Sequence, residues 1–181
     1  MVTIWTIGHS TRTLDEFVSL LKNHQLEALV DIRSFPASQR NPQFNSESLM
    51  KRLPESHIGY HWLGKALGGY RKRKDPNSPH IALTSPGFRN YADHMATGDF
   101  LQGVLELETL AGKKRVAIMC AEKLWWRCHR SLLSDYLTAC RGAEVIHILE
   151  KSRTEAHRLH RAARLVEGRL LYDVGGQLRL V

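Results

Sequence analysis

The chain has 181 residues, of which 43% are hydrophobic, and a formal net charge of +8 at pH 7. That length suits one domain with its own core, and this composition excludes a disordered chain or a disulfide-dependent scaffold. The apolar runs are too short to cross a bilayer, and residues 1–10 lack the basic leader of a signal peptide, so we expect a cytoplasmic protein without a membrane partner.

The charge and the cysteines bear on the partners and the redox setting. A basic protein attracts anions over a long range, so the expected ligand is an anionic small molecule or a nucleotide, with nucleic acid as an alternative partner. Three cysteines are an odd number, and we expect no disulfide framework in a reducing compartment. Nothing in the sequence fixes the oligomeric state.

The first elements alternate between strand and helix. Residues 3–7 and 28–32 are apolar runs typical of buried parallel strands. Between them, Thr13 and Glu16 have the spacing of a capping box, and apolar residues at helical spacing predict a helix that ends near Asn23. A strand, a helix and a strand in this order form the crossover unit of a parallel sheet.

The next segments combine a long polar loop with short elements. Residues 33–42 form a loop with two prolines, followed by a predicted helix at 46–53 and a predicted strand at 57–63. Glycines there allow a backbone to approach a ligand closely, and a lysine adds a cation, although the spacing does not match a nucleotide-hydrolase phosphate loop. The predicted ligand-binding residues of this segment are Gly64, Lys65, Gly68 and Gly69.

The following stretch leads to the central strand. Residues 75–85 form a proline-bearing loop that we expect to act as a flexible flap. Pro86 then begins a helix, and a second helix is predicted at 100–110 with Asp99 and Gln102 as its capping pair.

The last third of the chain predicts one more strand, a helix and a hairpin. Residues 144–149 are the fifth expected strand, and Ser152 opens a predicted helix over 153–164 whose outer side is rich in arginine. Residues 170–174 and 177–181 read as a terminal hairpin joined by two glycines.

Residues 115–140 carry the densest group of reactive side chains. A buried strand at 116–119 is followed by a loop and then by an amphipathic helix. A cysteine thiolate needs nearby cations or a helix amino end to lower its pKa, and both Cys120 and Cys128 have these in prospect. The alternative is that both cysteines are buried structural residues.

Polar residues follow each of the first four predicted strands. In a parallel sheet the carboxyl ends of the strands share one edge, where ligands bind. We therefore expect one cleft that combines four groups of residues. The groups are His9 with Ser10, Asp31 with Arg33, Gly64 with Lys65, and Cys120 with Glu122.

The residue types suggest separate roles. Thiols, carboxylates and imidazoles can act as nucleophile, acid or base, and we predict catalytic roles for Cys120, Glu122, His9, Asp31, Cys128 and His129. Guanidinium groups grip phosphate or carboxylate, and indoles can stack on bases. The predicted ligand-binding residues beyond the glycine-rich segment are Ser10, Arg33, Arg127, Arg130 and Trp125. Each arginine could instead form an internal salt bridge to Glu122 or Asp31.

A metal site is the less favoured alternative. Cys120, Cys128 and His129 with His9 or Asp31 could supply a mixed sulfur and nitrogen set. The sequence has no compact pair of ligand motifs at zinc-finger spacing, so we predict no cofactor and no metal.

Several motifs together resemble one known family. They are Ile7-Gly8-His9-Ser10-Thr11-Arg12, Asp31-Ile32-Arg33-Ser34-Phe35-Pro36, Asn41-Pro42-Gln43-Phe44, Leu67-Gly68-Gly69, Gly87-Phe88, Cys120-Ala121-Glu122 and Cys128-His129-Arg130. On these motifs the chain resembles domain-of-unknown-function family 488 over nearly its whole length. Many relatives have a proline-bearing segment where this chain has Leu124-Trp125-Trp126-Arg127. The family has no settled reaction, so the resemblance implies the fold and the site more than the chemistry.

Together these observations predict a single α/β domain over residues 1–181. We expect three layers, with a mainly parallel sheet of about five strands, helices on both faces and a C-terminal hairpin. The favoured function is an enzyme of hydrolytic or group-transfer type that binds an anionic, phosphate- or nucleotide-like ligand at the strand ends. The alternatives are a non-catalytic nucleic-acid or nucleotide-binding module, and a structural or regulatory partner protein.

Overall fold

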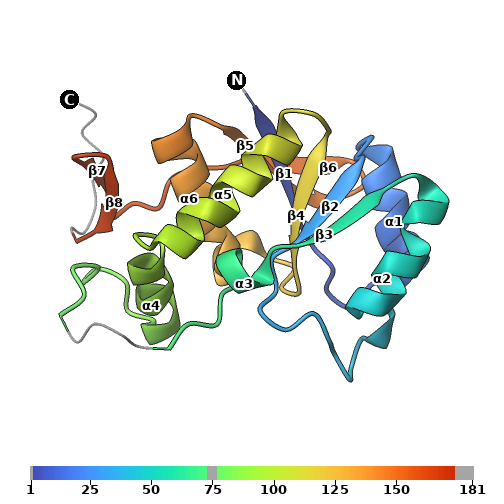
Figure 1. Cartoon of the computed structure of the whole chain (residues 1–181), viewed down its shortest axis with the longest axis horizontal. Helices are drawn as coiled ribbons and strands as arrows, with labels where there is room; N and C mark the ends of the chain where they lie inside the picture. The colour runs from blue at the N-terminus through green and yellow to red at the C-terminus, as the bar shows by residue number, and fades with distance from the viewer. Residues whose placement is uncertain (1, 73–76, 174–181) are drawn as a thin grey trace.

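The computed structural model describes residues 2–72 and 77–173, and its centre is a six-stranded sheet in the order β3-β2-β4-β1-β5-β6 (Figure 1). The strands of this sheet are β1 (Thr3–Gly8), β2 (Ala28–Asp31), β3 (Gly59–Trp62), β4 (Val116–Cys120), β5 (Glu144–Glu150) and β6 (Arg153–Ala156). The first five strands pair in parallel, and β6 pairs antiparallel with β5. The α/β fold with a mostly parallel sheet is therefore confirmed.

Helices cover both faces of this sheet. They are α1 (Leu14–Asn23), α2 (Ser46–Arg52), α3 (Gly64–Leu67), α4 (Pro86–His94), α5 (Gly98–Ala111) and α6 (Arg130–Arg141), with short 3₁₀ turns at η1 (Pro42–Phe44), η2 (Pro54–Ser56) and η3 (Trp125–Arg127). One hydrophobic cluster joins the sheet to α4, α5 and α6, and a second joins its other face to α1 and α2. Figure 1 shows α1 and α2 grouped together, away from α4, α5 and α6.

The side-chain alternation of the strands explains the two clusters. In β1, Ile4 packs toward α5 and α6 whereas Ile7 packs toward α1. In β4, Ile118 and Cys120 belong to the first cluster and Met119 to the second. Strands buried on both faces read as continuous apolar runs, as the sequence of β4 does.

The connections that follow β1 and β4 leave on opposite faces of the sheet and in opposite directions across it. After β1 the chain passes through α1 on one face, and after β4 it passes through α6 on the other face. Because β1 and β4 are adjacent, the loops that follow them diverge and leave a topological switch point at their carboxyl ends. Ligands of open α/β sheets bind at such points.

The sequence predicted the capping residues of α1 correctly and those of α5 wrongly. At α1, the Thr13 side chain accepts a hydrogen bond from the Glu16 amide and Glu16 bonds back to the Thr13 amide, so the predicted capping box is confirmed. At α5, the predicted capping pair is wrong. Thr97 is the cap there, and its hydroxyl accepts from the amide of Phe100.

The predicted arginine-rich helix over residues 153–164 is wrong. Residues 153–156 form β6 and pair with β5, and 163–166 form the next strand. A strand edge offered by β5 gives the backbone of this short segment hydrogen-bond partners, and that pairing overrides its weak helical spacing.

The chain also has the predicted C-terminal hairpin, with different boundaries. It consists of β7 (Ala163–Val166) and β8 (Arg169–Tyr172), and its turn residues Glu167 and Gly168 both have positive φ, as a tight two-residue hairpin turn requires. The predicted turn at residues 175–176 and the strand at 177–181 lie outside the described residues, as does part of the predicted flap at 75–85. In the part of the chain that is described, no helix is both long enough and apolar enough to cross a membrane.

Candidate functional site

Close backbone contact joins the loops at the switch point. The amide of His9 donates to the Cys120 carbonyl and the amide of Ser10 donates to the Ala121 carbonyl, both at 2.9 Å, so the ladder continues beyond the two strands. A Cβ atom on Gly8 would lie 1.9 Å from the carbonyl oxygen of Glu122, so only glycine fits there. This contact brings the first and fourth polar groups of the sequence together.

Two cysteines and a histidine gather on the α6 side of this point. Cys120, Cys128 and His129 are all buried, and their sulfur and nitrogen atoms lie within 4.8 Å of one another. Nε2 of His129 lies 3.2 Å from the Ile32 carbonyl, which can only accept, so Nε2 carries the proton. In neutral His129 the Nδ1 lone pair therefore faces Sγ of Cys120, at 3.9 Å.

The two thiols differ in ionisation. The hydrogen bond from Cys128 lowers the pKa of Cys120 from its ordinary value of 9.0 to about 6; burial opposes this shift and the charge of Arg130 supports it. The same sulfur contact and burial raise the pKa of Cys128 well above its ordinary value. The opposite directions of these two shifts make Cys120 the more acidic thiol of the pair.

Arg130 begins α6 and is only 1% exposed. Its Nε donates to Sγ of Cys128 at 3.2 Å, and its terminal nitrogens donate to the carbonyls of Glu122 and Lys123 and to the Thr6 hydroxyl. The guanidinium thus fixes the loop after β4 while it contacts the thiol pair.

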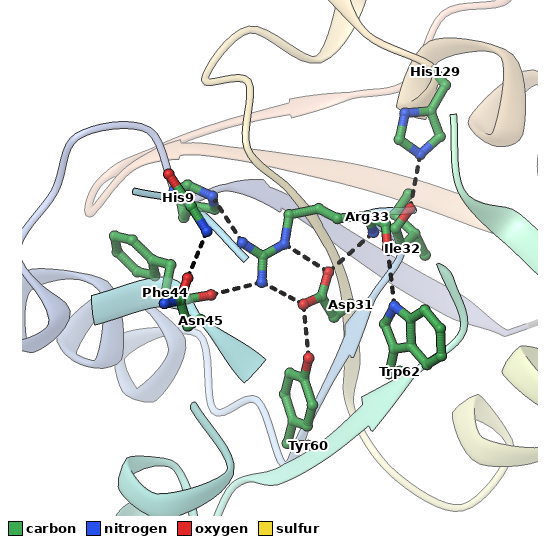
Figure 2. A network of polar contacts seen from close by, with 10 residues as sticks. His9, Asp31, Ile32, Arg33, Phe44, Asn45, Tyr60, Trp62 and His129 are labelled. Atoms are coloured by element: carbon green, nitrogen blue, oxygen red, sulfur yellow. Dashed lines mark hydrogen bonds and ion pairs between the residues drawn. The ribbon is translucent and has the colours of Figure 1, made fainter. Parts of the chain in front are cut away.

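A second polar cluster lies on the ends of β2 and β3 (Figure 2). Nε and one terminal nitrogen of Arg33 donate to the two oxygens of the Asp31 carboxylate at 2.9 and 2.5 Å. The Tyr60 hydroxyl donates to the same carboxylate at 2.8 Å, and Arg33 also donates to the Phe44 carbonyl at 2.7 Å. Asp31 and Arg33 are buried, so this is an internal two-pronged ion pair.

His9 completes the second cluster. Its Nδ1 donates to the Ser10 carbonyl, and its Nε2 lies 3.3 Å from a nitrogen of Arg33, from which it accepts. Burial lowers the pKa of His9 to about 4, and the ring stacks on Phe44 at 4.3 Å. His9 is therefore neutral at pH 7, and both ring nitrogens are engaged within the protein.

Ile32 joins the two clusters. Its carbonyl accepts from His129 of the thiol cluster, and its chain neighbours Asp31 and Arg33 form the ion pair. Figure 2 shows His129 beside Ile32, at one end of the network that surrounds Arg33. The sheet edge therefore holds two adjoining buried clusters.

Several other predicted site residues lie apart from these clusters. Exposed positions are occupied by Lys65, Glu122 and Arg127, while Ser10 is half-buried with a positive φ of 53°. The ring of Trp125 stacks on His147 at 4.1 Å, so one of its faces is covered by the protein itself.

The predicted glycines pack against the protein. A Cβ on Gly64 would meet the Arg33 carbonyl, and one on Gly68 would meet Ser34. A Cβ on Gly69 would lie 2.5 Å from Nδ1 of His129, so this backbone passes directly over the imidazole ring. Their binding of a ligand remains a prediction.

Two surface hollows lie away from both clusters. One of about 340 Å³ is lined by residues of β3 and α5, and one of about 290 Å³ by residues 82–88 and 160–162. Neither is lined by a predicted catalytic residue. The single cleft expected from the sequence is thus not among these two hollows.

The three atoms of the thiol cluster could reach one cation. Among the described residues no other group of three such side chains is close enough to share an ion. The guanidinium of Arg130 donates to Cys128 and would repel a cation placed there, so the geometry does not favour a metal at this cluster.

Sequence reasoning missed two residues that complete the clusters. Tyr60 supplies a hydroxyl to Asp31, and Thr6 supplies one to Arg130. Their signal was weak: each is a polar residue in a strand, on the same face as residues that the sequence did single out.

Comparison with family models gives one match, to the domain of unknown function DUF488, over residues 13–137. The chain belongs to the DUF488 family. The match includes Asp31, Arg33 and the whole thiol cluster, whereas β1 and the strands after α6 lie outside the matched DUF488 segment. No curated protein and no solved structure matches the chain.

Proposed function

We propose that this DUF488 protein is a thiol-dependent enzyme that performs a hydrolytic or group-transfer reaction on an anionic, phosphate- or nucleotide-like ligand. The observation that supports this most is the position of Cys120, whose pKa is lowered, at the carboxyl end of β4 beside Cys128 and His129. Strongly shifted ionisation at a topological switch point is typical of functional sites.

The arrangement suits a two-step reaction. Attack by the Cys120 thiolate on an electrophilic carbon or phosphorus forms a bond to Sγ, and the leaving group departs with its bonding electron pair. Water or an acceptor hydroxyl then attacks the intermediate and passes its proton to Nδ1 of His129, which releases Cys120 as a thiolate. His129 returns the proton to the first leaving group or to solvent.

Charge supports an anionic ligand. The net charge of +8 attracts anions, and exposed cations follow β3 and β4, at Lys65 in α3 and Arg127 in η3. The buried Asp31–Arg33 pair holds the neighbouring loop in place, a supporting role for these two residues.

The test is turnover of a small panel of phosphate monoesters, acyl esters and nucleoside 5′-phosphates. Cys120→Ser should lower turnover by at least about a thousandfold, because an alcohol at neutral pH is a far weaker nucleophile than a thiolate. Cys140→Ser is the matched control, since Cys140 lies outside the site, and should retain full activity.

Unchanged turnover in Cys120→Ser would contradict the proposal. Absence of turnover across the panel, with nucleotide or nucleic-acid binding that falls steeply with salt, would favour the non-catalytic binding module. Absence of both would leave the structural or regulatory partner protein.

A further inference from the structure

A run of buried hydrogen bonds leads from Arg130 away from the cysteines. A terminal nitrogen of Arg130 lies 3.5 Å from the Thr6 hydroxyl, which lies 2.7 Å from Nδ1 of His147. Nε2 of His147 lies 3.0 Å from Nδ1 of His157, and Nε2 of His157 lies 2.8 Å from the Asp135 carboxylate. Five side chains from β1, α6, β5 and the segment after β6 are linked in this relay.

Two ends of the relay have a fixed direction. A carboxylate only accepts, so Nε2 of His157 donates to Asp135. A guanidinium only donates, so the Thr6 oxygen accepts from Arg130. Between them, neutral His147 donates from one ring nitrogen and accepts at the other, so a continuous chain of hydrogen bonds joins the guanidinium to the carboxylate.

Burial keeps the relay in this state. Thr6, His147 and Asp135 are all 0% exposed. Burial, with help from His157 and Arg130, lowers the pKa of His147 to about 2, so this ring stays neutral. The indole of Trp125 covers its face, with the two rings only 6° from parallel.

The far end of the relay is anchored by the C-terminal part of the chain. The Tyr172 hydroxyl donates to the second oxygen of Asp135 at 2.9 Å, and the His160 amide donates to the first at 2.9 Å. Tyr172 belongs to β8, which lies beyond the family match.

We propose that Thr6, His147 and His157 are positioning residues that hold Arg130 against Cys128 and so orient the thiol pair. These three residues all come from segments outside the DUF488 match at 13–137. The inference deepens the proposed function and rests on it, because it concerns the reactivity of the same thiol.

The contact at Cys128 explains how the relay acts. Nε of Arg130 donates to Sγ of Cys128 at 3.2 Å, and this sulfur lies within 4.8 Å of Sγ of Cys120 and 3.8 Å from the Trp125 carbonyl. The positive charge of Arg130 also lowers the pKa of Cys120, because a nearby cation favours the thiolate. A guanidinium released at its Thr6 end can shift away from the pair, and the Cys120 thiolate is then less favoured.

The test compares two substitutions at one position. Thr6→Val keeps the side-chain shape and removes the hydroxyl, whereas Thr6→Ser keeps the hydroxyl and removes a methyl group. The readout is the rate of Cys120 alkylation by iodoacetamide between pH 4.5 and 9, with folding checked by circular dichroism. We expect Thr6→Val to slow alkylation at pH 5 by at least about threefold, equivalent to half a pKa unit, and Thr6→Ser to stay near the wild type.

A purely structural role predicts the opposite order, because Ser leaves a small cavity and Val does not. Equal alkylation profiles for Thr6→Val and wild type, or a larger effect of Ser than of Val, would overturn the relay. Thr138→Val is the matched control, since the buried Thr138 hydroxyl on α6 has no hydrogen-bond partner. It should leave the profile unchanged.

His157→Gln tests the relay at a second point should Thr6→Val not fold. It should shift the Cys120 profile in the same direction, and an unshifted profile would overturn the inference. The wild-type profile separates the two proposals. A Cys120 that titrates near 9 in the wild type contradicts both, whereas titration near 6 that no relay variant alters removes the relay and leaves the proposed function standing.

Discussion

The pair of Asp31 and Arg33 shows how a charge can be kept inside this protein. The carboxylate accepts from two nitrogens of the guanidinium and from Tyr60, and Arg33 also donates to His9 and to the Phe44 carbonyl. These hydrogen bonds offset the cost of removing both ions from water. The pair is therefore tolerated only while both partners are present.

Asp31→Asn should accordingly lower the free energy of unfolding by about 3–5 kcal/mol, because Arg33 is left as a buried charge without its counterion. Urea unfolding at pH 7 measures this. Tyr60→Phe removes one hydrogen bond from the same carboxylate and should cost only about 1 kcal/mol. Equal losses in the two variants would mean that the pair is not the source of the effect.

At the scale of single residues, the sequence predicted which side chains form the site better than it predicted their hydrogen-bond partners. His9, Asp31, Arg33, Cys120, Cys128 and His129 were all singled out, and the structure places them in two adjoining clusters. The sequence left open whether Arg33 binds a ligand or forms a salt bridge to Asp31, and the structure shows the salt bridge. Which nitrogen of His9 donates depends on side-chain geometry that spacing does not encode.

Among the elements, the short α3 and the turn after it pack against the thiol cluster. Gly69 follows α3 and lies against the ring of His129, and the amide of Tyr70 donates to the Ser34 hydroxyl. The glycines of this turn were predicted to let a ligand approach the backbone, and one of them, Gly69, lies against an imidazole.

Gly69→Ala should therefore displace the His129 ring from Cys120. Its new Cβ would lie 2.5 Å from Nδ1 of a ring that is buried and cannot swing away. We expect a lower melting temperature and an altered pH profile of Cys120 alkylation. Gly98→Ala is the matched control: its Cβ meets no atom within 4 Å in the first turn of α5, and it should be neutral or stabilising by up to about 1 kcal/mol.

Helices and strands whose caps and apolar spacing agree could be predicted from the sequence. Segments whose structure depends on pairing with another strand could not. Helix α1 has a capping box and a continuous apolar face, and its predicted end at Asn23 matches the structure. Residues 153–164 have helix-like spacing over a few positions only, and the free edge of β5 decides their structure. Such an edge exists only once the sheet has formed.

The molecule as a whole keeps six histidines neutral, four of them buried and two, His24 and His61, half-buried. Burial lowers the pKa of each of them from 6.5, and they are His9, His24, His61, His80, His129 and His147. In the unfolded chain these rings accept a proton near pH 6.5, whereas in the folded protein they do so only at lower pH. Below pH 6.5 the unfolded state binds more protons, so acid favours unfolding.

We expect the free energy of unfolding to fall as the pH drops from 6.5 to 5, by about 2 kcal/mol for each of His9 and His147. Urea unfolding at pH 7, 6 and 5 measures the decline. Replacement of His9 by Asn removes one titrating group and should make the decline shallower. A stability that is constant over this range would contradict the neutral buried state of these rings.

The overall architecture followed from the sequence only in outline. Alternating strands and helices predicted a mostly parallel sheet with both faces covered, which the structure confirms. The strand order did not follow, because the insertion of β4 between β1 and β2 is settled by helix packing on the two faces.

The central place of β1 has a consequence for how the protein is made. Both of its neighbours, β4 and β5, lie more than a hundred residues later in the chain, so β1 leaves the ribosome long before either of its sheet partners has been made. Pairings so distant along the chain fold slowly and leave apolar strands exposed to aggregation in the meantime. Refolding from urea should therefore be slow, and chaperones that bind nascent chains should raise the yield of native protein.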